Sequence, residues 1–274
     1  MSSTSRKKVA LVTGASSGIG KSIVQQLLKD GWIVYGAARR VEKMNDIVAM
    51  GAQVLPLDVT DESSMTAAVQ TLVSMEGKID ALVNNAGYGS YGALEDVPIS
   101  EAKRQFEVNV FGLMRLTQLI LPTMRAAKSG TIVNISSMGG RIWMPIGGWY
   151  HATKYAVEVL SDALRMETKP FGIRVVVVQP GAIQSEWSSI AAQTLRDTSQ
   201  GSVYGATVEP MARVLNHYNN SSSPDVVAKA VSLAVNSPNP KRRYPTPMDA
   251  KLLIFLHWLL PDFLWELVIK SVIK

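Results

Sequence analysis

Short apolar runs rich in β-branched residues alternate with longer segments of helical periodicity along most of the chain. Such runs predict buried strands, and the helical segments between them predict crossovers between parallel strands. We expect strands at Val9–Thr13, Ile33–Ala37, Gln53–Leu57, Ala81–Asn84, Thr131–Ile135, Val175–Gln179 and Arg243–Thr246. We expect helices at Gly18–Lys29, Glu62–Met75, Glu101–Ala127, Trp149–Lys169 and Asp225–Asn236.

This alternation predicts an α/β fold of the Rossmann type. The sheet would be doubly wound, seven-stranded and mostly parallel, with helices on both faces and a C-terminal helical extension. No repeat, low-complexity tract or Gly/Ser linker divides the chain, so residues 1–274 are expected to form a single domain. Doubly wound sheets bind ligands beyond the carboxyl ends of their strands, and the residues there are the candidates for chemistry.

Composition removes several classes of function. The chain has 274 residues, 47% of them hydrophobic and 18% charged, which excludes a disordered protein. It has no cysteine, which excludes disulfides, thiolate nucleophiles and iron–sulfur clusters and favours an intracellular protein. Its three histidines lie far apart in the sequence, so no metal site is expected.

The formal net charge is +6 at pH 7, and the excess lies in three short basic groups. We interpret two of them, residues 6–8 and 241–243, as solvated surface rather than as a nucleic-acid site. Residues 1–8 are polar and lack the apolar core of a secretory signal, so a cytoplasmic location is expected.

The C-terminal segment, residues 249–274, is rich in Leu, Trp and Phe. Pro261 and several charged residues interrupt it, so it is not expected to span a membrane. Its spacing predicts two amphipathic helices, with Pro261 opening the second. They could cover the substrate site, join subunits or lie on a membrane surface as a peripheral contact; packing on the protein is favoured because the charges balance.

A glycine-rich loop, Thr13–Gly20, follows the first strand and leads directly into a helix. At this junction, glycines let the backbone approach a pyrophosphate, and the free N–H groups of the helix stabilise its charge. Gly14, Ser16 and Gly18 also fit the nucleophile pattern of serine hydrolases, with His217 or His257 as the base. The dinucleotide interpretation is favoured because it also explains the motifs below.

Arg39 and Arg40 stand at the end of the second strand, where an NAD enzyme would place a carboxylate for the ribose 2′-hydroxyl. Guanidinium groups suit a 2′-phosphate through paired, charge-assisted hydrogen bonds. The sequence therefore predicts NADP(H) as the cofactor.

Further motifs follow the other strands. They are Asp58-Val59, Asn84-Asn85-Ala86-Gly87, Asn109, Ser136-Ser137, Tyr150-His151-Ala152-Thr153-Lys154 and Pro180-Gly181. With these motifs the chain resembles the short-chain dehydrogenase/reductase family over nearly its whole length. Its details are most similar to the subgroup of 17β-hydroxysteroid and retinol dehydrogenases and their bacterial relatives.

Tyr150 and Lys154 are four residues apart on one predicted helix, so they share a face. A nearby ammonium favours the phenolate, which would make Tyr150 a usable acid and base. The resemblance implies that Lys154 also holds the nicotinamide ribose, that Ser137 bonds the substrate oxygen, and that Asn109 bends its helix and anchors a water linked to the lysine. Ser137 is preferred to Ser136 because it lies 13 residues before Tyr150, as in the family.

The resemblance also implies a set of cofactor contacts. They are Gly14, Ser16, Ser17, Gly18, Ile19, Gly20, Arg39, Arg40, Asp58, Val59, Asn85, Ala86, Gly87, Asn109, Tyr150, Lys154, Pro180, Gly181 and Ile183. Asn84 is interpreted as a structural residue that ties strand ends together.

A mobile substrate loop is expected at residues 184–218, over the open side of the nicotinamide. Apolar residues near it predict a pocket for a lipophilic carbonyl or alcohol such as a steroid, a retinoid or a long-chain compound. With Ser137, the expected substrate contacts are Met138, Trp143, Trp149 and Trp187. The resemblance further implies a homodimer or homotetramer, and a catalytically silent NADP(H)-sensing scaffold is the alternative function.

Overall fold

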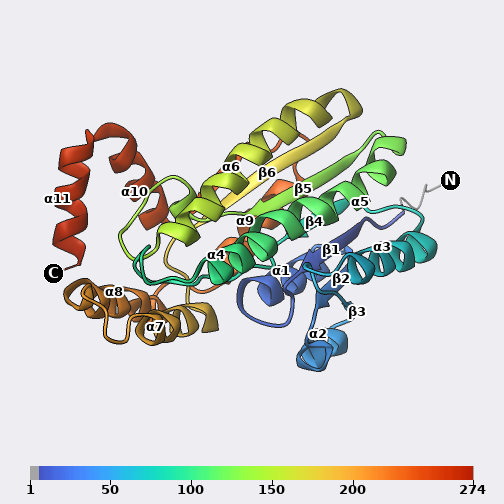
Figure 1. Cartoon of the computed structure of the whole chain (residues 1–274). Coiled ribbons are helices and arrows are strands. Elements are labelled where there is room, and N and C mark those ends of the chain that lie inside the picture. Colours follow the sequence, from blue (N-terminus) through green and yellow to red (C-terminus); the bar gives the residue numbers. More distant parts are fainter. Residues whose placement is uncertain (1–5, 274) are drawn as a thin grey trace.

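Seven parallel strands form one sheet in the order β3-β2-β1-β4-β5-β6-β7 (Figure 1). The computed structural model describes residues 6–273. The strands are β1 (Val9–Thr13), β2 (Ile33–Ala38), β3 (Gln53–Pro56), β4 (Ala81–Asn84), β5 (Gly130–Ile135), β6 (Ile173–Pro180) and β7 (Arg243–Thr246). The predicted Rossmann-type sheet is therefore confirmed, including its short seventh strand.

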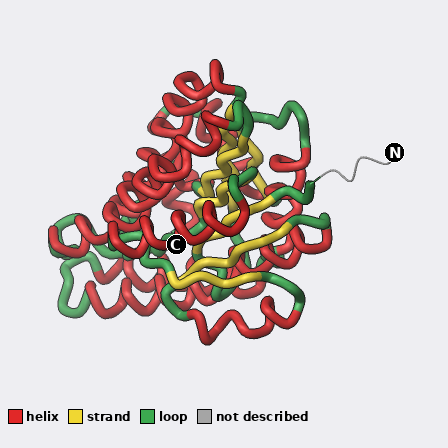
Figure 2. Tube along the Cα trace, turned by 90° about the vertical axis from the view of Figure 1, so that its right-hand side faces the viewer, coloured by secondary structure: helices red, strands yellow, loops and turns green. Residues whose placement is uncertain are grey.

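Helices cover both faces of the sheet, as Figure 2 shows from the side. On one face α1 (Gly18–Lys29) and α9 (Asp225–Asn236) pack against each other and against the strands. On the other face lie α3 (Glu62–Glu76), α5 (Leu113–Ala126) and α6 (Gly148–Thr168). Because both faces are covered, every residue of β1 is buried, which explains its continuous apolar sequence.

The remaining helices surround the carboxyl ends of the strands or extend the chain. They are α2 (Asn45–Ala49), α4 (Ile99–Phe106), α7 (Glu186–Thr198), α8 (Gly205–His217), α10 (Met248–Leu259) and α11 (Asp262–Val272). Short turns are η1 (Val41–Met44), η2 (Glu107–Gly112), η3 (Met138–Gly140), η4 (Lys169–Phe171) and η5 (Tyr218–Asn220).

Two sequence predictions differ from the structure. The helix expected at Glu101–Ala127 is interrupted, because η2 is a turn of π-helix between α4 and α5. The segment expected as a loop at residues 184–218 contains α7 and α8, which pack against each other. Their buried residues, including Ala191, Leu195 and Met211, form an apolar cluster that holds the two helices over the site.

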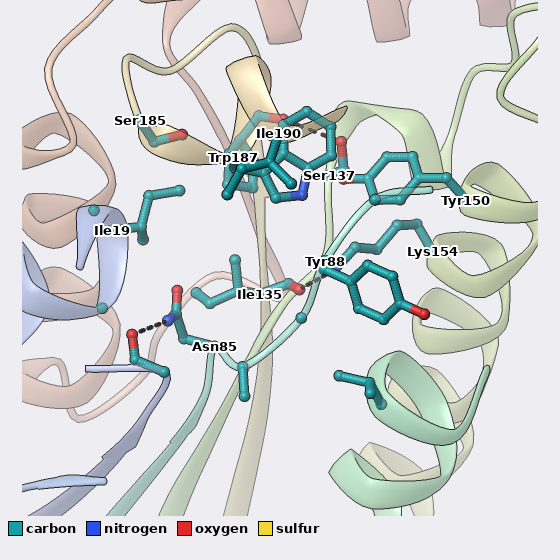
Figure 3. Close-up of a pocket in the computed structure, with 18 of the residues that line it drawn as sticks. Ile19, Asn85, Tyr88, Ile135, Ser137, Tyr150, Lys154, Ser185, Trp187 and Ile190 are labelled. Atoms are coloured by element: carbon teal, nitrogen blue, oxygen red, sulfur yellow. Dashed lines mark hydrogen bonds between the residues drawn. The ribbon is translucent and has the colours of Figure 1, made fainter. Parts of the chain in front are cut away.

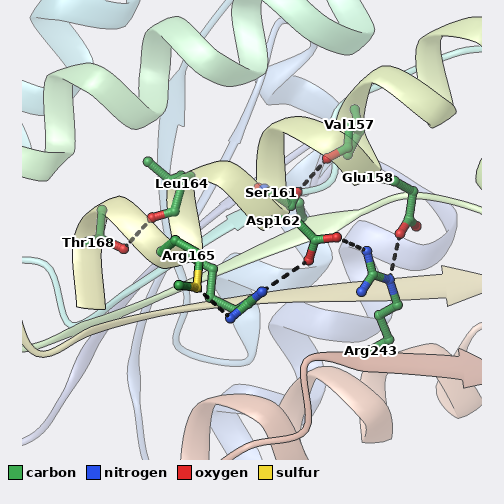
Figure 4. Close-up of polar contacts among 10 residues, drawn as sticks. Val157, Glu158, Ser161, Asp162, Leu164, Arg165, Thr168 and Arg243 are labelled. Carbon is green, nitrogen blue, oxygen red and sulfur yellow. Dashed lines mark hydrogen bonds and ion pairs between the residues drawn. The ribbon is translucent and has the colours of Figure 1, made fainter.

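An ion-pair network fastens the last strand to α6 (Figure 4). The Arg243 Nε donates to Glu158 Oε2 at 2.8 Å, and its Nη2 donates to Asp162 Oδ2 at 2.6 Å. The other Glu158 oxygen accepts a hydrogen bond from Gln179 of β6 at 2.9 Å. Glu158 is almost fully buried, so these partners satisfy a carboxylate that would otherwise be costly to bury.

After β7 the chain forms a helical hairpin, α10 and α11, drawn in red at the left of Figure 1. Ala250, Trp265 and Ile269 are buried on its inner side. The His257 ring stacks edge-on against Trp265 at 4.8 Å between ring centroids, which joins the two helices. Within residues 6–273, no helix combines the length and the apolar character needed to cross a bilayer.

Candidate active site

A cavity of about 710 Å³ lies beyond the carboxyl ends of the strands. Its walls come from the turns after strands β1 to β6, together with α6, α7 and α8. This is the position at which a doubly wound sheet is expected to bind its ligand.

The glycine-rich loop forms one end of the cavity. Gly14 has φ +67°, and a Cβ atom there would lie 2.8 Å from the Asn85 amide nitrogen. A Cβ atom on Gly20 would lie 2.2 Å from the Gly14 carbonyl oxygen, so only glycine allows α1 to begin so close to the loop. The resulting cradle of backbone at a helix N-terminus fits a pyrophosphate.

Thr13 connects this loop to the turn after β4. Its hydroxyl accepts hydrogen bonds from the backbone N–H groups of Asn85 at 3.0 Å and Ala86 at 2.9 Å. The Asn85 side chain donates in return to the Thr13 carbonyl at 2.9 Å. Asn84 points elsewhere and donates to Asn134 and Thr117 in the core, which confirms the structural role inferred for it.

Arg39 and Arg40 are exposed and line the cavity where β2 ends. Neither guanidinium forms an ion pair or hydrogen bond with another residue of the part of the chain that the structure describes. Two unneutralised cations beside the cradle fit a 2′-phosphate. A carboxylate at this position would instead suit the 2′-hydroxyl of a plain ribose.

Ser137, Tyr150 and Lys154 meet at the centre of the cavity (Figure 3). Helix α6 places Tyr150 and Lys154 on one side, with the Lys154 Nζ 5.9 Å from the Tyr150 ring centroid. The Lys154 ammonium donates to the Ile135 carbonyl at 3.0 Å, which fixes it against the end of β5. Ser137 follows β5 and accepts a hydrogen bond from the backbone N–H of Gly139 at 3.0 Å.

Burial controls the ionisation of both groups on α6. It raises the pKa of Tyr150 to about 12, although the Ser137 hydroxyl acts in the opposite direction. It lowers the pKa of Lys154 to about 8, against the influence of Glu158. The expected lowering of the Tyr150 pKa by Lys154 is therefore absent, because the loss of water around the phenol outweighs the other influences.

Asn109 does not line the cavity, unlike the other predicted cofactor residues. It is buried in η2, where its amide donates to the Tyr88 carbonyl at 2.9 Å and to the Thr153 hydroxyl at 3.1 Å. Its carbonyl accepts from the backbone N–H of Tyr88 at 3.0 Å. Asn109 is thus a positioning residue that holds the turn after β4 against α6, because the π-helical turn directs its side chain inward.

The substrate end of the cavity is apolar and aromatic. The Trp187 ring lies 5.2 Å from the Tyr150 ring and 6.0 Å from the Tyr91 ring. Of the predicted substrate contacts, Ser137, Met138 and Trp187 line the cavity. The other apolar or aromatic walls include Tyr91, Ile142, Met144, Ile190, Leu215 and Tyr218.

Two residues predicted as substrate contacts do not line the cavity. Trp143 is 39% exposed and lies outside the cavity, and Trp149 packs edge-on against Phe106 of α4 instead. Adjacency to Ser137 and Tyr150 in sequence did not determine where these indoles point. Tyr91 was not predicted, because only the folded chain brings it to Tyr150. Tyr218 ends the segment expected over the nicotinamide, and burial raises the pKa of both phenols.

The remaining predicted cofactor residues lie along the cavity wall. They are Gly14, Ser16, Ser17, Gly18, Ile19, Gly20, Asp58, Val59, Asn85, Ala86, Gly87, Pro180, Gly181 and Ile183. Ser16 lines the cavity, whereas neither His217 nor His257, the histidines expected as its base in a serine hydrolase, does so. The structure therefore does not support the hydrolase alternative.

Residues 8–196 match the family model described as short chain dehydrogenase. The chain belongs to the short-chain dehydrogenase family. Family membership accounts together for the glycine loop, the Asn85 turn and the set of Ser137, Tyr150 and Lys154. The family is one of oxidoreductases.

Three relatives extend this comparison. The chain is 44% identical to a 3-ketodihydrosphingosine reductase of Bacteroides thetaiotaomicron over 174 residues, which is 64% of this chain and 63% of that protein. It is 32% identical to an NADPH-dependent 3-dehydrocapnine reductase of Ornithobacterium rhinotracheale, over 97% and 98% of the two chains. The crystal structure of a short-chain dehydrogenase from Streptomyces avermitilis superposes with a TM-score of 0.81 at 35% identity, covering 92% of this chain and 93% of that one.

Proposed function

We propose that this short-chain dehydrogenase uses NADPH to reduce the carbonyl group of a lipophilic substrate. The observation that carries the proposal is the continuous cavity. It joins the glycine loop and Arg39 at one end, through Ser137 and Tyr150, to an apolar wall at the other. Among the lipophilic classes that the sequence suggested, a long-chain ketone is favoured over a steroid or retinoid.

In this reaction the bound nicotinamide supplies a hydride to the carbonyl carbon. The hydroxyls of Ser137 and Tyr150 hold the carbonyl oxygen, and Tyr150 transfers its phenolic proton to that oxygen as the alcohol forms. Lys154 stabilises the phenolate that remains, and solvent then returns the proton. The ammonium is held in position for this by the Ile135 carbonyl at 3.0 Å.

The ionisation of Tyr150 fits the role of proton donor in reduction. With its pKa raised to about 12 by burial, the phenol carries its proton at neutral pH. A protonated phenol is ready to donate to a carbonyl oxygen, whereas alcohol oxidation requires the phenolate first.

The choice of NADP(H) rests on Arg39 and Arg40. Both line the cavity, and neither is neutralised by a described carboxylate. A 2′-phosphate would gain two charge-assisted partners there. The related 3-dehydrocapnine reductase is NADPH-dependent, which agrees with this choice.

The preference for a long-chain ketone rests on the shape of the cavity and on two relatives. The cavity volume of about 710 Å³ and its walls of Met138, Trp187 and Ile190 suit an extended apolar group. The relatives named for 3-ketodihydrosphingosine and 3-dehydrocapnine act on ketones.

We also propose that two copies associate through α5 and α6, as the family resemblance implies. Val159 and Met166 on α6 and Phe111 in η2 are large apolar side chains that face solvent in the single chain. Their burial in a second copy would remove this apolar surface from water.

The proposed function is tested by following NADPH oxidation with a panel of carbonyls. The panel holds 3-ketodihydrosphingosine, a long-chain aliphatic ketone, a steroid ketone, retinal and a small hydrophilic ketone, with NADH in parallel. We expect turnover with NADPH and the long-chain ketones. Turnover of the small ketone alone would contradict the lipophilic substrate, and the absence of turnover with NADPH still bound would favour a sensing scaffold.

A further inference from the structure

The α10–α11 hairpin has two different sides. On its inner side Ala250, Trp265 and Ile269 are buried against Met138 and Ile142. The latter two residues also line the cavity of the active site. The hairpin is therefore the outer layer of the wall that surrounds the substrate end of the cavity.

The other side of the hairpin presents large apolar side chains to solvent. We call this set the outer hairpin face. Trp258 is 75% exposed, Phe263 65% and Phe255 53%. The face consists of Leu252, Phe255, Trp258, Leu259, Phe263 and Leu267.

Each helix of the hairpin contributes an exposed apolar stripe to the outer hairpin face. Leu252, Phe255 and Leu259 follow each other at helical spacing on α10, and Phe263 and Leu267 do so on α11. The Phe255 and Trp258 rings lie 6.0 Å apart. Exposed apolar surface of this kind marks an interaction site, because water around it is unfavourable.

We propose that the outer hairpin face docks on the surface of a lipid bilayer. The proposal rests on the proposed function, since a long-chain ketone of low solubility resides in a membrane and the hairpin packs behind Met138 and Ile142 of the cavity that would receive it. Helices of 12 and 11 residues are too short to cross a bilayer, so the hairpin would lie in the plane of the interface.

Two further observations favour a bilayer over a second copy of the chain. Trp258 is the most exposed aromatic residue of the face, and indole rings prefer the interface between lipid and water. The exposed apolar residues Phe111 of η2 and Val159 and Met166 of α6 supply a different surface for a second copy.

Charge predicts how this docking should behave. The exposed charges of the described hairpin are Lys251 and Lys270 against Asp262 and Glu266, so they balance. Binding should therefore depend on apolar contact, with little dependence on salt or on anionic lipid.

The test uses the full chain and sedimentation with vesicles of phosphatidylcholine, alone and mixed with phosphatidylglycerol. The variant Trp258→Ser/Phe263→Ser removes two exposed aromatics from the face. The matched control, Val203→Ser/Leu233→Ser, removes two apolar side chains that are 88% and 63% exposed elsewhere. Thermal unfolding and turnover of a soluble short-chain ketone show that each variant is folded.

We expect the wild type and the control to sediment with both kinds of vesicle, and the hairpin variant to bind about tenfold more weakly. Equal vesicle binding by the hairpin variant would overturn the proposal. A wild type that does not bind vesicles would overturn it as well. If, in addition, the wild type is a dimer in solution and the hairpin variant a monomer, the face is a contact between two copies of the chain.

The failure of the proposed function has a different signature. If vesicle binding is lost only in the hairpin variant, but long-chain ketones are reduced neither in vesicles nor in detergent, the docking surface stands and the substrate assignment is wrong. If docking fails while detergent-dispersed long-chain ketones are reduced, the substrate assignment stands.

Discussion

The Asp249 carboxylate accepts a hydrogen bond from the backbone N–H of Ala182 at 3.0 Å. Its second oxygen accepts from the backbone N–H of Ala250 at 2.8 Å. A Cβ atom on Gly181 would lie 2.7 Å from both carboxylate oxygens, so glycine is required for this contact. The first turn of α10 thereby holds the turn after β6, which contains the predicted cofactor contacts Gly181 and Ile183.

Replacing Asp249 by Ala should loosen this turn. We expect KM for NADPH to rise about fivefold and Tm to fall by a few degrees, because the loss of one such hydrogen bond costs about 1 kcal/mol. Asp249→Asn keeps one acceptor oxygen and should lose less. Steady-state kinetics and thermal unfolding measure both effects. Asp262→Ala, at an exposed carboxylate on α11, is the control; an Asp249→Ala enzyme that behaves like this control would contradict the positioning role.

Removing the Tyr150 hydroxyl should remove the proton donor. We expect Tyr150→Phe to lower kcat at least about a hundredfold while Kd for NADPH changes little, because the ring remains and only proton transfer is lost. Turnover and fluorescence titration with NADPH separate the two effects. Tyr155→Phe on the same helix should retain activity. Near-normal turnover of Tyr150→Phe would disprove the assigned role.

Arg39 and Arg40 should determine the choice of cofactor. We expect Arg39→Ala/Arg40→Ala to lower kcat/KM with NADPH about a hundredfold and to leave the value with NADH nearly unchanged, since only the 2′-phosphate contacts are lost. The ratio of the two values is the measurement. Arg242→Ala removes an exposed guanidinium far from the cavity and should leave the ratio as it is. An equal loss with both cofactors would instead indicate a structural effect.

The lowered pKa of Lys154 predicts a pH dependence. Burial brings this pKa to about 8, so the free enzyme loses the ammonium charge as pH rises through that value. We expect kcat/KM for NADPH to be constant below pH ~8 and to fall up to about tenfold per pH unit above it. Lys154→Arg keeps its charge and should be less active but lack this decline. A wild-type profile that is flat up to pH ~10 would contradict the interpretation.

The network around Arg243 should be important for stability rather than chemistry. In Arg243→Ala, the Glu158 carboxylate stays buried and keeps only its hydrogen bond from Gln179. We expect the free energy of unfolding to fall by about 3 kcal/mol and Tm by roughly ten degrees. Denaturant and thermal unfolding provide the measurement, with the exposed neighbour Arg242→Ala as the control. Unfolding energies that match for the two variants would show that the ion pairs contribute little.

The sequence by itself determined the sheet and the chemistry at its edge. The β-branched runs predicted the strands and the Thr13–Gly20 loop predicted the cradle, because both depend on local backbone geometry. The four-residue spacing of Tyr150 and Lys154 predicted their common face, because a helix repeats every 3.6 residues.

Only the tertiary structure decided the positions of side chains that depend on contacts between distant segments. The inward turn of Asn109, the outward position of Trp143 and the approach of Tyr91 and Tyr218 to Tyr150 follow from packing, which local periodicity does not specify. The same holds for ionisation: proximity of Lys154 alone would lower the pKa of Tyr150, but burial raises it, and burial is a property of the whole fold. Likewise, the spacing on the C-terminal helices predicted amphipathic character, and only packing on Met138 showed which apolar residues remain in water.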